Sequence, residues 1–514
     1  MGTTPRIHDT QTTLETAEES EVKNVGKIVR KIQERKRVLD AMEQGHLEYQ
    51  QLLQIVKFSA AFQARAARLR DLVDRLFGSS SSRIAIAAFL LVIVFFSLML
   101  YTPWASRDGQ QVEFHHAVFT ATSAVTVTGL TTVSTAEQWT FFGQLMILLG
   151  SQIGGLGTLT LTSILALAVG RKLGLRSKII AQESLNIGRL GEVGSVLRTV
   201  AFTSIAIEAL IAFTLIPRFL VLGEPLWQAV WHGVFYAVSS FNNAGFTPHS
   251  DGIVPYGHDL WILFPIALGV MVGSLGFPVI LVLRNNLRFS KWNLNAKLTI
   301  IGTLALFFLG SFAWGALEWG NDRTIGTMGV GDKMLNAAFA SIMTRSGGFN
   351  LVDMADIHPV TMLLTDVLMF IGGGSASTAG GIKITTITVV FLAILAEARG
   401  DQFVVAFNRT IPDAVLRIAI SVIMMSFVFV LAGTTAIMLI GQVGLDRALF
   451  EVISAYATCG LSTGLSAELP PSGTYILSIL MLIGRIGTIT IATGLAMRSR
   501  RRLYKFPEER PIIG

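Results

Sequence analysis

The feature that most constrains this fold is a short motif that recurs four times between long apolar segments. Each copy runs from small or polar residues through a glycine to a large apolar residue, and its glycine is residue 129, 245, 348 or 460. A half-apolar stretch with helical character precedes each motif, and an apolar run follows it. Because internal repetition at a near-regular period marks a repeated structural unit, we expect four copies of one helical unit.

The apolar runs that flank the motifs approach the length of membrane spans, which need about 20 residues. There are eight, at 84–101, 141–167, 201–221, 261–282, 298–317, 362–394, 414–440 and 475–496. Only 15% of the 514 residues are charged and 51% are hydrophobic, whereas soluble domains carry about 25% charged residues. The sequence therefore predicts an all-α polytopic membrane protein: four pseudo-symmetric helix–pore loop–helix repeats, with eight transmembrane helices and four pore helices around one central pore.

The repeats are expected to occupy residues 83–170, 171–283, 284–398 and 399–497, between an N-terminal extension (1–82) and a C-terminal tail (498–514). Within the extension, apolar residues recur at helical spacing over 47–77, which is typical of a helix lying on a membrane surface or on a partner. No secretory signal precedes the first apolar run.

Lys and Arg gather in alternate connections, at 171–198, 284–297 and 399–417 and in the tail, and the remaining loops carry few of them. This positive-inside pattern predicts that both termini of this multi-pass protein lie on the cytoplasmic side of the cell's inner (cytoplasmic) membrane. It also accounts for the formal net charge of +7 without nucleic acid as a partner.

The four motifs predict a cation filter. Non-helical backbone at membrane depth must be buried in protein or line water, and the carbonyl oxygens of such turns can replace the hydration shell of an ion. Short helices that enter from outside would also direct their partially negative C-terminal ends toward the ion. The candidate filter residues are Thr126, Val127, Thr128, Gly129, Asn243, Ala244, Gly245, Ser346, Gly347, Gly348, Thr458, Cys459 and Gly460.

The third repeat departs from the others because ten consecutive small or hydroxyl residues interrupt its second apolar run. Such a segment should unwind the span, and unwound backbone at that depth must line a cavity. Just inside the filter it is either a mobile gate or a flexible kink without a gating role. The candidate gate residues are Gly372, Gly373, Gly374, Ser375, Ala376, Ser377, Thr378, Ala379, Gly380, Gly381 and Lys383.

Arg485 lies inside the last apolar run, and an ionisable residue at membrane depth is a functional hypothesis by default. It would act either as a barrier or latch for the gate, or as a donor that satisfies carbonyls of the glycine-rich loop. Glu208 and Asp366 also lie in apolar runs, and the sequence identifies no partner for either. The eight histidines form no metal-ligand motif, and the single cysteine allows no internal disulfide.

Together these residues resemble the Trk/Ktr/HKT superfamily of potassium transporters. The resemblance spans about residues 84–514 and rests on the four glycine turns, the run GGGSASTAGGIKITT, the arginine in GRIGTIT and the tail FPEERPIIG, which is similar to the KtrB-like membrane subunits of the Ktr branch. It implies that potassium binds the carbonyls of the glycine ring, that residues 372–383 form the gate, and that Arg485 latches it. Glycine at position 129 implies potassium rather than sodium.

The resemblance also implies a homodimer on a cytosolic, KtrA-like ring of nucleotide-binding regulatory subunits, with uptake that sodium stimulates. No covalent cofactor is expected: potassium occupies the filter, sodium is a second candidate ion, and a nucleotide binds the regulatory subunit alone. Besides these partners, membrane lipid is expected and nucleic acid is not.

The leading hypothesis is therefore a gated, channel-like pore for potassium uptake. The alternative is a sodium-coupled potassium carrier (symporter) with alternating access. Carriers often place broken helices in inverted repeats, but the four repeats here share one polarity. An enzyme is disfavoured because no acid/base or metal set converges in the sequence.

Overall fold

The computed structural model of the chain describes residues 81–156 and 193–487. These two ranges contain all four glycine turns and the glycine-rich run at 372–383. The predicted amphipathic segment at 47–77, most of the basic connection at 171–198 and the C-terminal tail lie outside the described residues.

The described chain is almost entirely helical, and its elements recur in the predicted order. The first two segments contain α3 (Ser81–Leu100), α4 (Phe114–Thr126) and α6 (Phe141–Gly155), then α9 (Val193–Val221), α10 (Leu226–Phe241), α11 (Leu260–Leu275) and α12 (Phe277–Asn285). The last two contain α13 (Leu294–Glu318), α14 (Val330–Met343), α15 (Pro359–Phe370) and α16 (Ile384–Arg399), then α17 (Asp413–Gly441), α18 (Leu445–Ala457) and α20 (Pro471–Ile486).

The remaining elements are short. They are α5 (Thr135–Gln138), α19 (Leu465–Glu468), the 3-10 turns η1 (Pro103–Ala105), η3 (Val254–Tyr256) and η4 (Phe289–Lys291), and one antiparallel pair, β1 (Val405–Ala406) with β2 (Arg409–Thr410). Local sequence sets several helix starts: the side chains of Asp259 and Asn293 accept hydrogen bonds from Trp261 N and Ala296 N at the first turns of α11 and α13.

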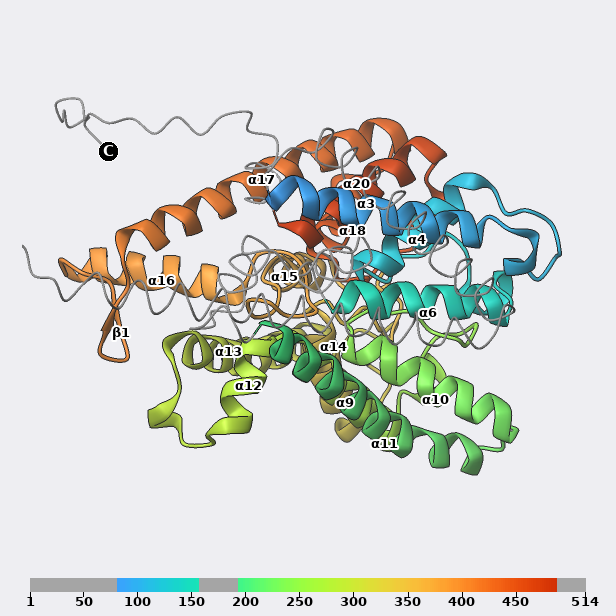
Figure 1. Cartoon of the computed structure of the whole chain (residues 1–514), viewed down its shortest axis with the longest axis horizontal. Helices are drawn as coiled ribbons and strands as arrows, with labels where there is room; N and C mark the ends of the chain where they lie inside the picture. The colour runs from blue at the N-terminus through green and yellow to red at the C-terminus, as the bar shows by residue number, and fades with distance from the viewer. Residues whose placement is uncertain (1–80, 157–192, 488–514) are drawn as a thin grey trace, which may run out of the picture. The chain divides into compact units, whose positions relative to one another are not determined.

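The four short helices α4, α10, α14 and α18, labelled in Figure 1, are linked in a closed cycle through the longer helices that they contact. Each contacts the long helix before it: α4 contacts α3, α10 contacts α9, α14 contacts α13 and α18 contacts α17. Each also contacts the helix that follows the preceding glycine turn: α10 contacts α6, α14 contacts α11, α18 contacts α15, and α4 contacts α20. The last contact joins the two ends of the described chain, so the cycle closes.

Among the described residues, three helical segments are long and apolar enough to cross a membrane: Thr199–Val221, Leu294–Glu318 and Asp413–Gly441. A fourth candidate is the pair α11 and α12, which meet at 98°. Four shorter apolar helices cover the remaining predicted runs: Ile86–Leu100, Phe141–Gly155, Pro359–Phe370 and Pro471–Ile486. Each of the eight predicted runs therefore coincides with an apolar helix, although several of these helices are broken or short.

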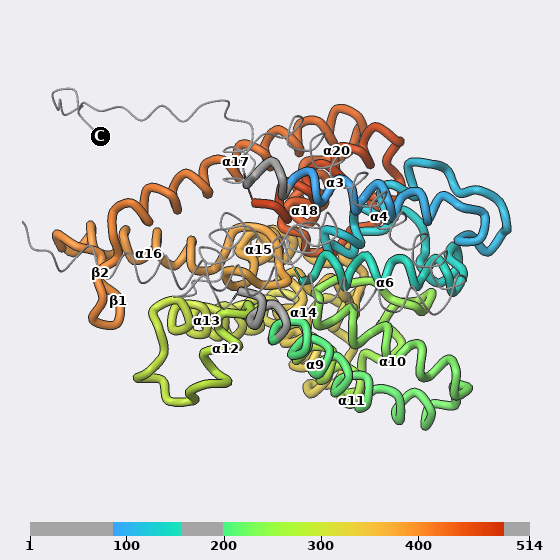
Figure 2. The backbone as a smooth tube through the Cα atoms, viewed as in Figure 1, coloured from blue at the N-terminus to red at the C-terminus, as the bar shows by residue number. Residues whose placement is uncertain are grey.

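Two of the eight predicted apolar runs are interrupted. The run 261–282 breaks at Gly276, whose φ of +90° is open to glycine, and Pro278 sits at the first turn of the next helix, where its missing N–H is harmless. The unbroken span expected there is wrong. The run 362–394 breaks between Phe370 and Ile384, which is the interruption that the ten small residues predict; the tube in Figure 2 shows α15 and α16 as separate helices.

Large apolar side chains cover the outward faces of the long helices. Phe202 and Phe213 of α9, Phe312 of α13 and Leu439 of α17 are each at least 71% exposed. Exposed apolar side chains of this size along long helices are typical of surfaces that face lipid rather than water. These apolar helices and their exposed side chains identify the chain as a membrane protein.

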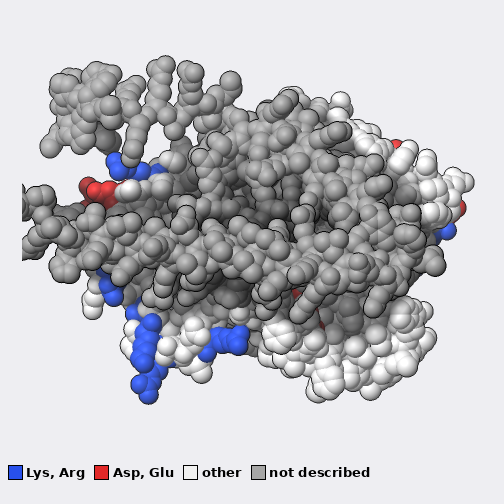
Figure 3. Space-filling view, in the orientation of Figure 1, with Lys and Arg blue, Asp and Glu red and all other residues white. Residues whose placement is uncertain are grey.

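Basic side chains gather at one end of these helices. Arg284 in the last turn of α12, and Arg288 and Lys291 between α12 and α13, are exposed. Figure 3 shows Lys and Arg side chains over this connection and near β1 and β2. The loop between α3 and α4 lies at the other end of the helices (Figure 1).

Candidate functional site

The four glycine turns share one backbone conformation. The non-glycine residue two positions before each glycine adopts a left-handed φ: Val127 +58°, Asn243 +60°, Ser346 +61° and Thr458 +48°. The glycines themselves have positive φ values of +90°, +69°, +73° and +95° at positions 129, 245, 348 and 460. A left-handed L-residue costs about 1–2 kcal/mol, and such strain concentrates at functional sites.

Serine side chains hold three of these turns at the ends of their short helices. Ser123 Oγ accepts a hydrogen bond from Gly129 N at 3.0 Å, and Ser454 Oγ accepts one from Gly460 N at 3.1 Å. Ser239 Oγ instead donates to the carbonyl of Phe246 at 2.8 Å. The third turn has no counterpart among the described hydrogen bonds; there Gly347 N donates to Met343 O at 2.8 Å.

The turns contact one another in a ring. A methyl group placed on Gly245 would lie 3.3 Å from the Gly347 carbonyl oxygen, and one on Gly348 would lie 2.9 Å from the Cys459 carbonyl oxygen. Methyl groups on Gly129 and Gly460 would collide with the carbonyl oxygens of Ala244 and Thr128, respectively. Each glycine thus abuts the carbonyl oxygen that precedes the glycine of the next turn, and the fourth turn abuts the first.

Small residues in the second helices permit the short helices to end where they do. Methyl groups on Gly154, Gly273 and Gly484 would collide with the carbonyl oxygens of Val125, Phe241 and Tyr456. In each case that carbonyl lies four residues before the glycine of the turn. The same close approach in three segments shows that these glycines serve close packing between helices, as small residues at helical spacing do in membrane proteins.

The third turn contains a second buried arginine, which sequence reasoning did not single out. Arg345 is 4% exposed, and its Nη1 donates to the Thr303 carbonyl of α13 at 2.9 Å. Its own carbonyl accepts a hydrogen bond from Asn243 Nδ2 at 3.1 Å, so it links the second and third turns. The signal was available in the sequence, since Arg345 directly precedes the motif.

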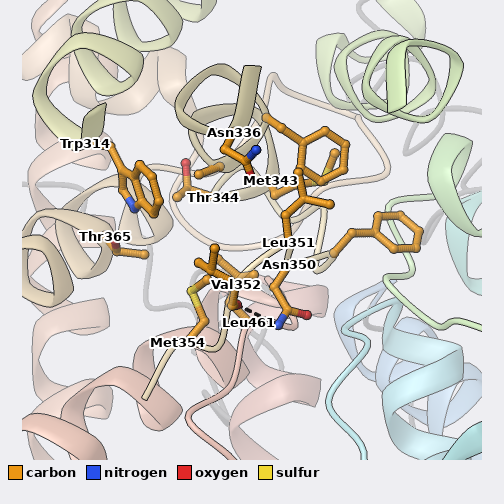
Figure 4. Close-up of a pocket in the computed structure, with 13 residues that line it drawn as sticks. Trp314, Asn336, Met343, Thr344, Asn350, Leu351, Val352, Met354, Thr365 and Leu461 are labelled. Atoms are coloured by element: carbon orange, nitrogen blue, oxygen red, sulfur yellow. Dashed lines mark hydrogen bonds between the residues drawn. The ribbon is translucent and has the colours of Figure 1, made fainter. Parts of the chain in front are cut away.

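The segment after the third turn closes a small pocket behind the ring (Figure 4). Trp314 of α13 and Met343 of α14 line it together with Leu461, which follows the fourth turn. Asn350 Nδ2 donates to the Val352 carbonyl at 2.9 Å and fixes the segment's course. The segments that follow the third and fourth turns therefore pack against the same group of side chains.

On one side of the ring the four glycines line an open cavity of about 620 Å³. Its walls come from the segments after each turn, at 131–135, 246–254, 350–353 and 462–467. Polar and apolar groups contribute to the lining, and Asp251, Asp353 and His249 are among them. We call this cavity the mouth.

The glycine-rich loop, residues 371–383, is held by backbone hydrogen bonds to the end of α11 and the start of α12. Gly374 N donates to Ser274 O at 2.7 Å, and Phe277 N donates to Ala376 O at 3.2 Å. Within the loop, Gly372 N donates to Ile382 O at 2.8 Å. The breaks in the second and third segments therefore pair with each other, which satisfies backbone groups that helices would otherwise satisfy.

This loop also contacts the glycine turns directly. Thr378 Oγ1 donates to Asn243 Oδ1 at 2.9 Å, and a methyl group on Gly380 would collide with the side chain of Thr458. Ser346 Oγ meanwhile donates to the Ala457 carbonyl at 3.1 Å. The structure thus places the glycine-rich loop in direct contact with the second and fourth glycine turns, and links the third turn to the fourth.

Arg485 lies between the loop and the first segment. Its Nη1 donates to the Thr378 carbonyl, and its Nη2 donates to the Gly154 carbonyl near the end of α6 at 2.5 Å. Lys383 Nζ donates to the Ala379 carbonyl at 2.6 Å. Arg485 therefore donates to a carbonyl of the glycine-rich loop, as one of its two predicted roles requires. The other predicted role, a latch, would act through the same hydrogen bonds.

The acidic residues in apolar runs differ in their partners. Glu208 Oε1 accepts from Asn242 Nδ2 at 3.1 Å, and that amide also donates to Gln152 Oε1 at 2.8 Å. Asp366 is 4% exposed, and its Oδ1 has no hydrogen-bond partner among the described residues. Sequence reasoning also missed Glu451, a fully buried carboxylate that accepts from Ser462 at 2.7 Å and so fixes the segment after the fourth turn.

Residues 79–501 match the family model TrkH, described as cation transport protein. The chain is 34% identical over 427 residues to Ktr system potassium uptake protein B of Bacillus subtilis, covering 83% of this chain and 95% of that protein. It is 35% identical to the protein of the same name from Vibrio alginolyticus, covering 84% and 94%. It is 32% identical to the potassium/sodium uptake protein NtpJ of Enterococcus hirae, covering 83% and 96%.

The fold is also similar to the crystal structure of the potassium transporter TrkH from Vibrio parahaemolyticus, with a TM-score of 0.62 and 16% identity over 80% of this chain and 84% of that one. The chain belongs to the TrkH family of cation transport proteins. Its relatives are transport proteins rather than enzymes, and the disfavoured enzyme hypothesis is accordingly excluded.

Proposed function

We propose that this chain is a potassium uptake subunit in which the four glycine turns form a selective, channel-like pore. Potassium would bind the carbonyl oxygens of Thr128, Ala244, Gly347 and Cys459 and of neighbouring turn residues. The single observation that carries this proposal is the closed ring in which each glycine abuts the next turn's carbonyl. Four pseudo-symmetric repeats, with eight transmembrane helices and four pore helices, are the arrangement that best fits that ring.

The names of the relatives support potassium as the ion. A membrane potential supplies about 2.3 kcal/mol per charge for each 100 mV, which supports roughly fiftyfold accumulation. A passive pore is therefore sufficient for uptake. Sodium would act as a stimulating ion, and the relative named for both potassium and sodium favours some role for it. A sodium-coupled carrier is the second candidate.

Residues 372–383 of the glycine-rich loop would act as the gate. Thr378 contacts Asn243 of the second turn and Gly380 contacts Thr458 of the fourth, and none of these residues lines the mouth. Arg485 would hold the closed state because it bonds carbonyls of the loop and of α6 at once. Movement of the loop would then require both bonds to break.

We propose the cytoplasmic membrane as its location, with both termini on the cytoplasmic side, and a homodimer that binds a KtrA-like ring of nucleotide-binding subunits. The exposed basic side chains at 284–291 support this orientation, and the Ktr system names of the relatives support an assembly. A thiol introduced at Arg288 should be labelled only from the cytoplasmic side. Cys459 does not interfere, because it is the chain's single cysteine and is buried.

Growth tests the function directly. Expression in bacteria that lack potassium uptake systems should restore growth at low external potassium, alone or with a KtrA-like subunit. A variant that collapses the ring, Gly460→Ala, should reach the membrane and fail to restore growth. Failure of the native chain under both conditions, with protein present in the membrane, would contradict potassium uptake.

A further inference from the structure

Two histidines and a glutamate meet beside the mouth, away from the filter and the loop. Glu224 lies in the connection between α9 and α10, His232 lies in α10, and His249 follows the second glycine turn. Glu224 Oε2 is 2.7 Å from His232 Nδ1, and Glu224 Oε1 is 3.1 Å from His249 Nε2. One ligand atom from each residue lies within 4.8 Å of the other two.

These distances are close to those of a zinc site. Zinc binds imidazole nitrogen and carboxylate oxygen at 2.0–2.2 Å, so tetrahedral ligand atoms lie roughly 3.3–3.6 Å apart. Small rotations of the side chains are enough to open that space. Two histidines and one carboxylate also form a ligand set that favours first-row transition ions over calcium or magnesium.

A second layer of contacts orients one ligand. Tyr236 Oη donates to the Gly252 carbonyl at 3.2 Å, which leaves its oxygen to accept from His249 Nδ1 at 2.9 Å. A proton on Nδ1 leaves Nε2 as the lone-pair nitrogen, and Nε2 is the atom that faces Glu224. Metal-ligating histidines usually carry such a hydrogen bond on the other ring nitrogen.

The cluster is sheltered but accessible. The side chains of Glu224, His232 and His249 are 16%, 17% and 20% exposed, and His249 lines the mouth. Three protein ligands with a solvent-accessible side leave a position for water as the fourth ligand. Phe219 packs on both imidazoles, with ring centroids 6.2 Å and 5.9 Å away, and restricts their movement.

We propose that Glu224, His232 and His249 form a binding site for a divalent transition ion of the zinc class. The ion would tie the start of α10 to the segment that follows the second glycine turn. Among the described residues one other cluster could offer three ligands: Glu113, His115 and His116. Glu113 in that cluster is 76% exposed, and Thr132 already bonds His116 Nδ1 at 2.7 Å. This second cluster therefore serves as the internal control for zinc binding.

The test is calorimetric titration of the purified, tag-free full chain in lipid nanodiscs with zinc chloride. The native protein should bind one zinc per chain at this site. Glu224→Gln, His232→Gln and His249→Gln should each abolish that binding event at concentrations that saturate the native protein. Tyr236→Phe should weaken it by about 10- to 100-fold, as loss of an orienting hydrogen bond does. The double variant His115→Gln with His116→Gln should retain it.

A cysteine variant keeps the proposal testable even if the glutamine variants unfold. His249→Cys replaces one zinc ligand by another, so it should still bind. With cobalt in place of zinc it should acquire a sulfur-to-cobalt charge-transfer band that the native protein lacks, because the native thiol, Cys459, is buried. Absence of that band in folded protein, or unchanged zinc binding in the Glu224, His232 and His249 variants, would overturn the site.

A consequence for transport rests on the proposed function. Zinc added on the mouth side should change potassium flux through the native chain and leave the Glu224→Gln variant unaffected. Direct binding does not depend on transport, so a chain that binds zinc but conducts nothing would refute the pore and retain the metal site.

Discussion

Gly348→Ser is the substitution that bears most directly on the ring. Gly348 has a φ of +73°, and a Cβ placed on it would lie 2.9 Å from both the Cys459 carbonyl oxygen and the Gly245 Cα. Contacts this short with backbone atoms require the turns to shift. The neighbour that must move includes one of the four carbonyls that we assign to potassium.

Gly348→Ser should affect both the stability of the third turn and the selectivity of the ring for potassium over sodium. Left-handed backbone costs an L-residue about 1–2 kcal/mol, and relief of the contacts displaces the third and fourth turns relative to each other. If the displacement removes about 1.4 kcal/mol from the difference between potassium and sodium binding, selectivity falls about tenfold. We therefore expect the potassium-over-sodium flux ratio to fall by about one order of magnitude, with the protein still folded.

The assay is tracer flux of both ions into liposomes, with thermal unfolding as a check on folding. Gly464→Ser is the matched control: Gly464 has a φ of +83°, yet nothing lies within 4 Å of a Cβ placed there. It shares the backbone strain without the contact with the ring and should leave the ratio unchanged. An unaltered flux ratio in folded Gly348→Ser protein, or an equal change in both variants, would refute the filter assignment.

Three further predictions concern the loop, each measured by tracer flux into liposomes. Arg485→Gln removes the bonds to the loop and to α6 and should raise flux. The control Arg447→Gln breaks a partly exposed ion pair worth about 1 kcal/mol or less and should leave flux unchanged. Equal flux in both variants would argue against a latch. Thr378→Val deletes the bond to Asn243 and should lower the free energy of unfolding by about 0.5–1.5 kcal/mol while raising flux, and a stability loss with unchanged flux would leave that bond merely structural. Deletion of residues 375–379 should raise flux, and unchanged or lower flux in folded protein contradicts a gate.

Sequence reasoning located the ring because its signals are local and repeated. A glycine after a short helix recurs four times, and each glycine has the positive φ that its residue type permits. The left-handed residues two positions earlier were not foreseen as such, since Val127 and Thr458 have β-branched side chains that disfavour this conformation. Tertiary contacts of the ring override their local preference.

Of the two breaks in the apolar runs, the sequence predicted the one at 372–381 and missed the one at Gly276. Ten small residues after Ile371 indicate an interruption without knowledge of the fold. Gly276 resembles a packing glycine inside one span, although the following Pro278 is a signal for a new helix start. At the break, Phe277 N pairs with the Ala376 carbonyl, and this contact between segments far apart in the sequence was beyond prediction.

Side-chain links across the site lay beyond prediction for the same reason. The bonds from Asn243 to Thr378 and to the Arg345 carbonyl join three separate segments. Glu224, His232 and His249 likewise have no motif spacing and become neighbours only once the second glycine turn directs the chain back over α10.

Potassium flux driven by an imposed membrane potential, in liposomes that hold this chain with sodium present and absent, tests the central claim most directly. A gated pore predicts flux that follows the potential with no fixed sodium ratio, so that sodium changes only the rate. Flux that requires inward sodium at a constant ratio would contradict the pore and support the carrier.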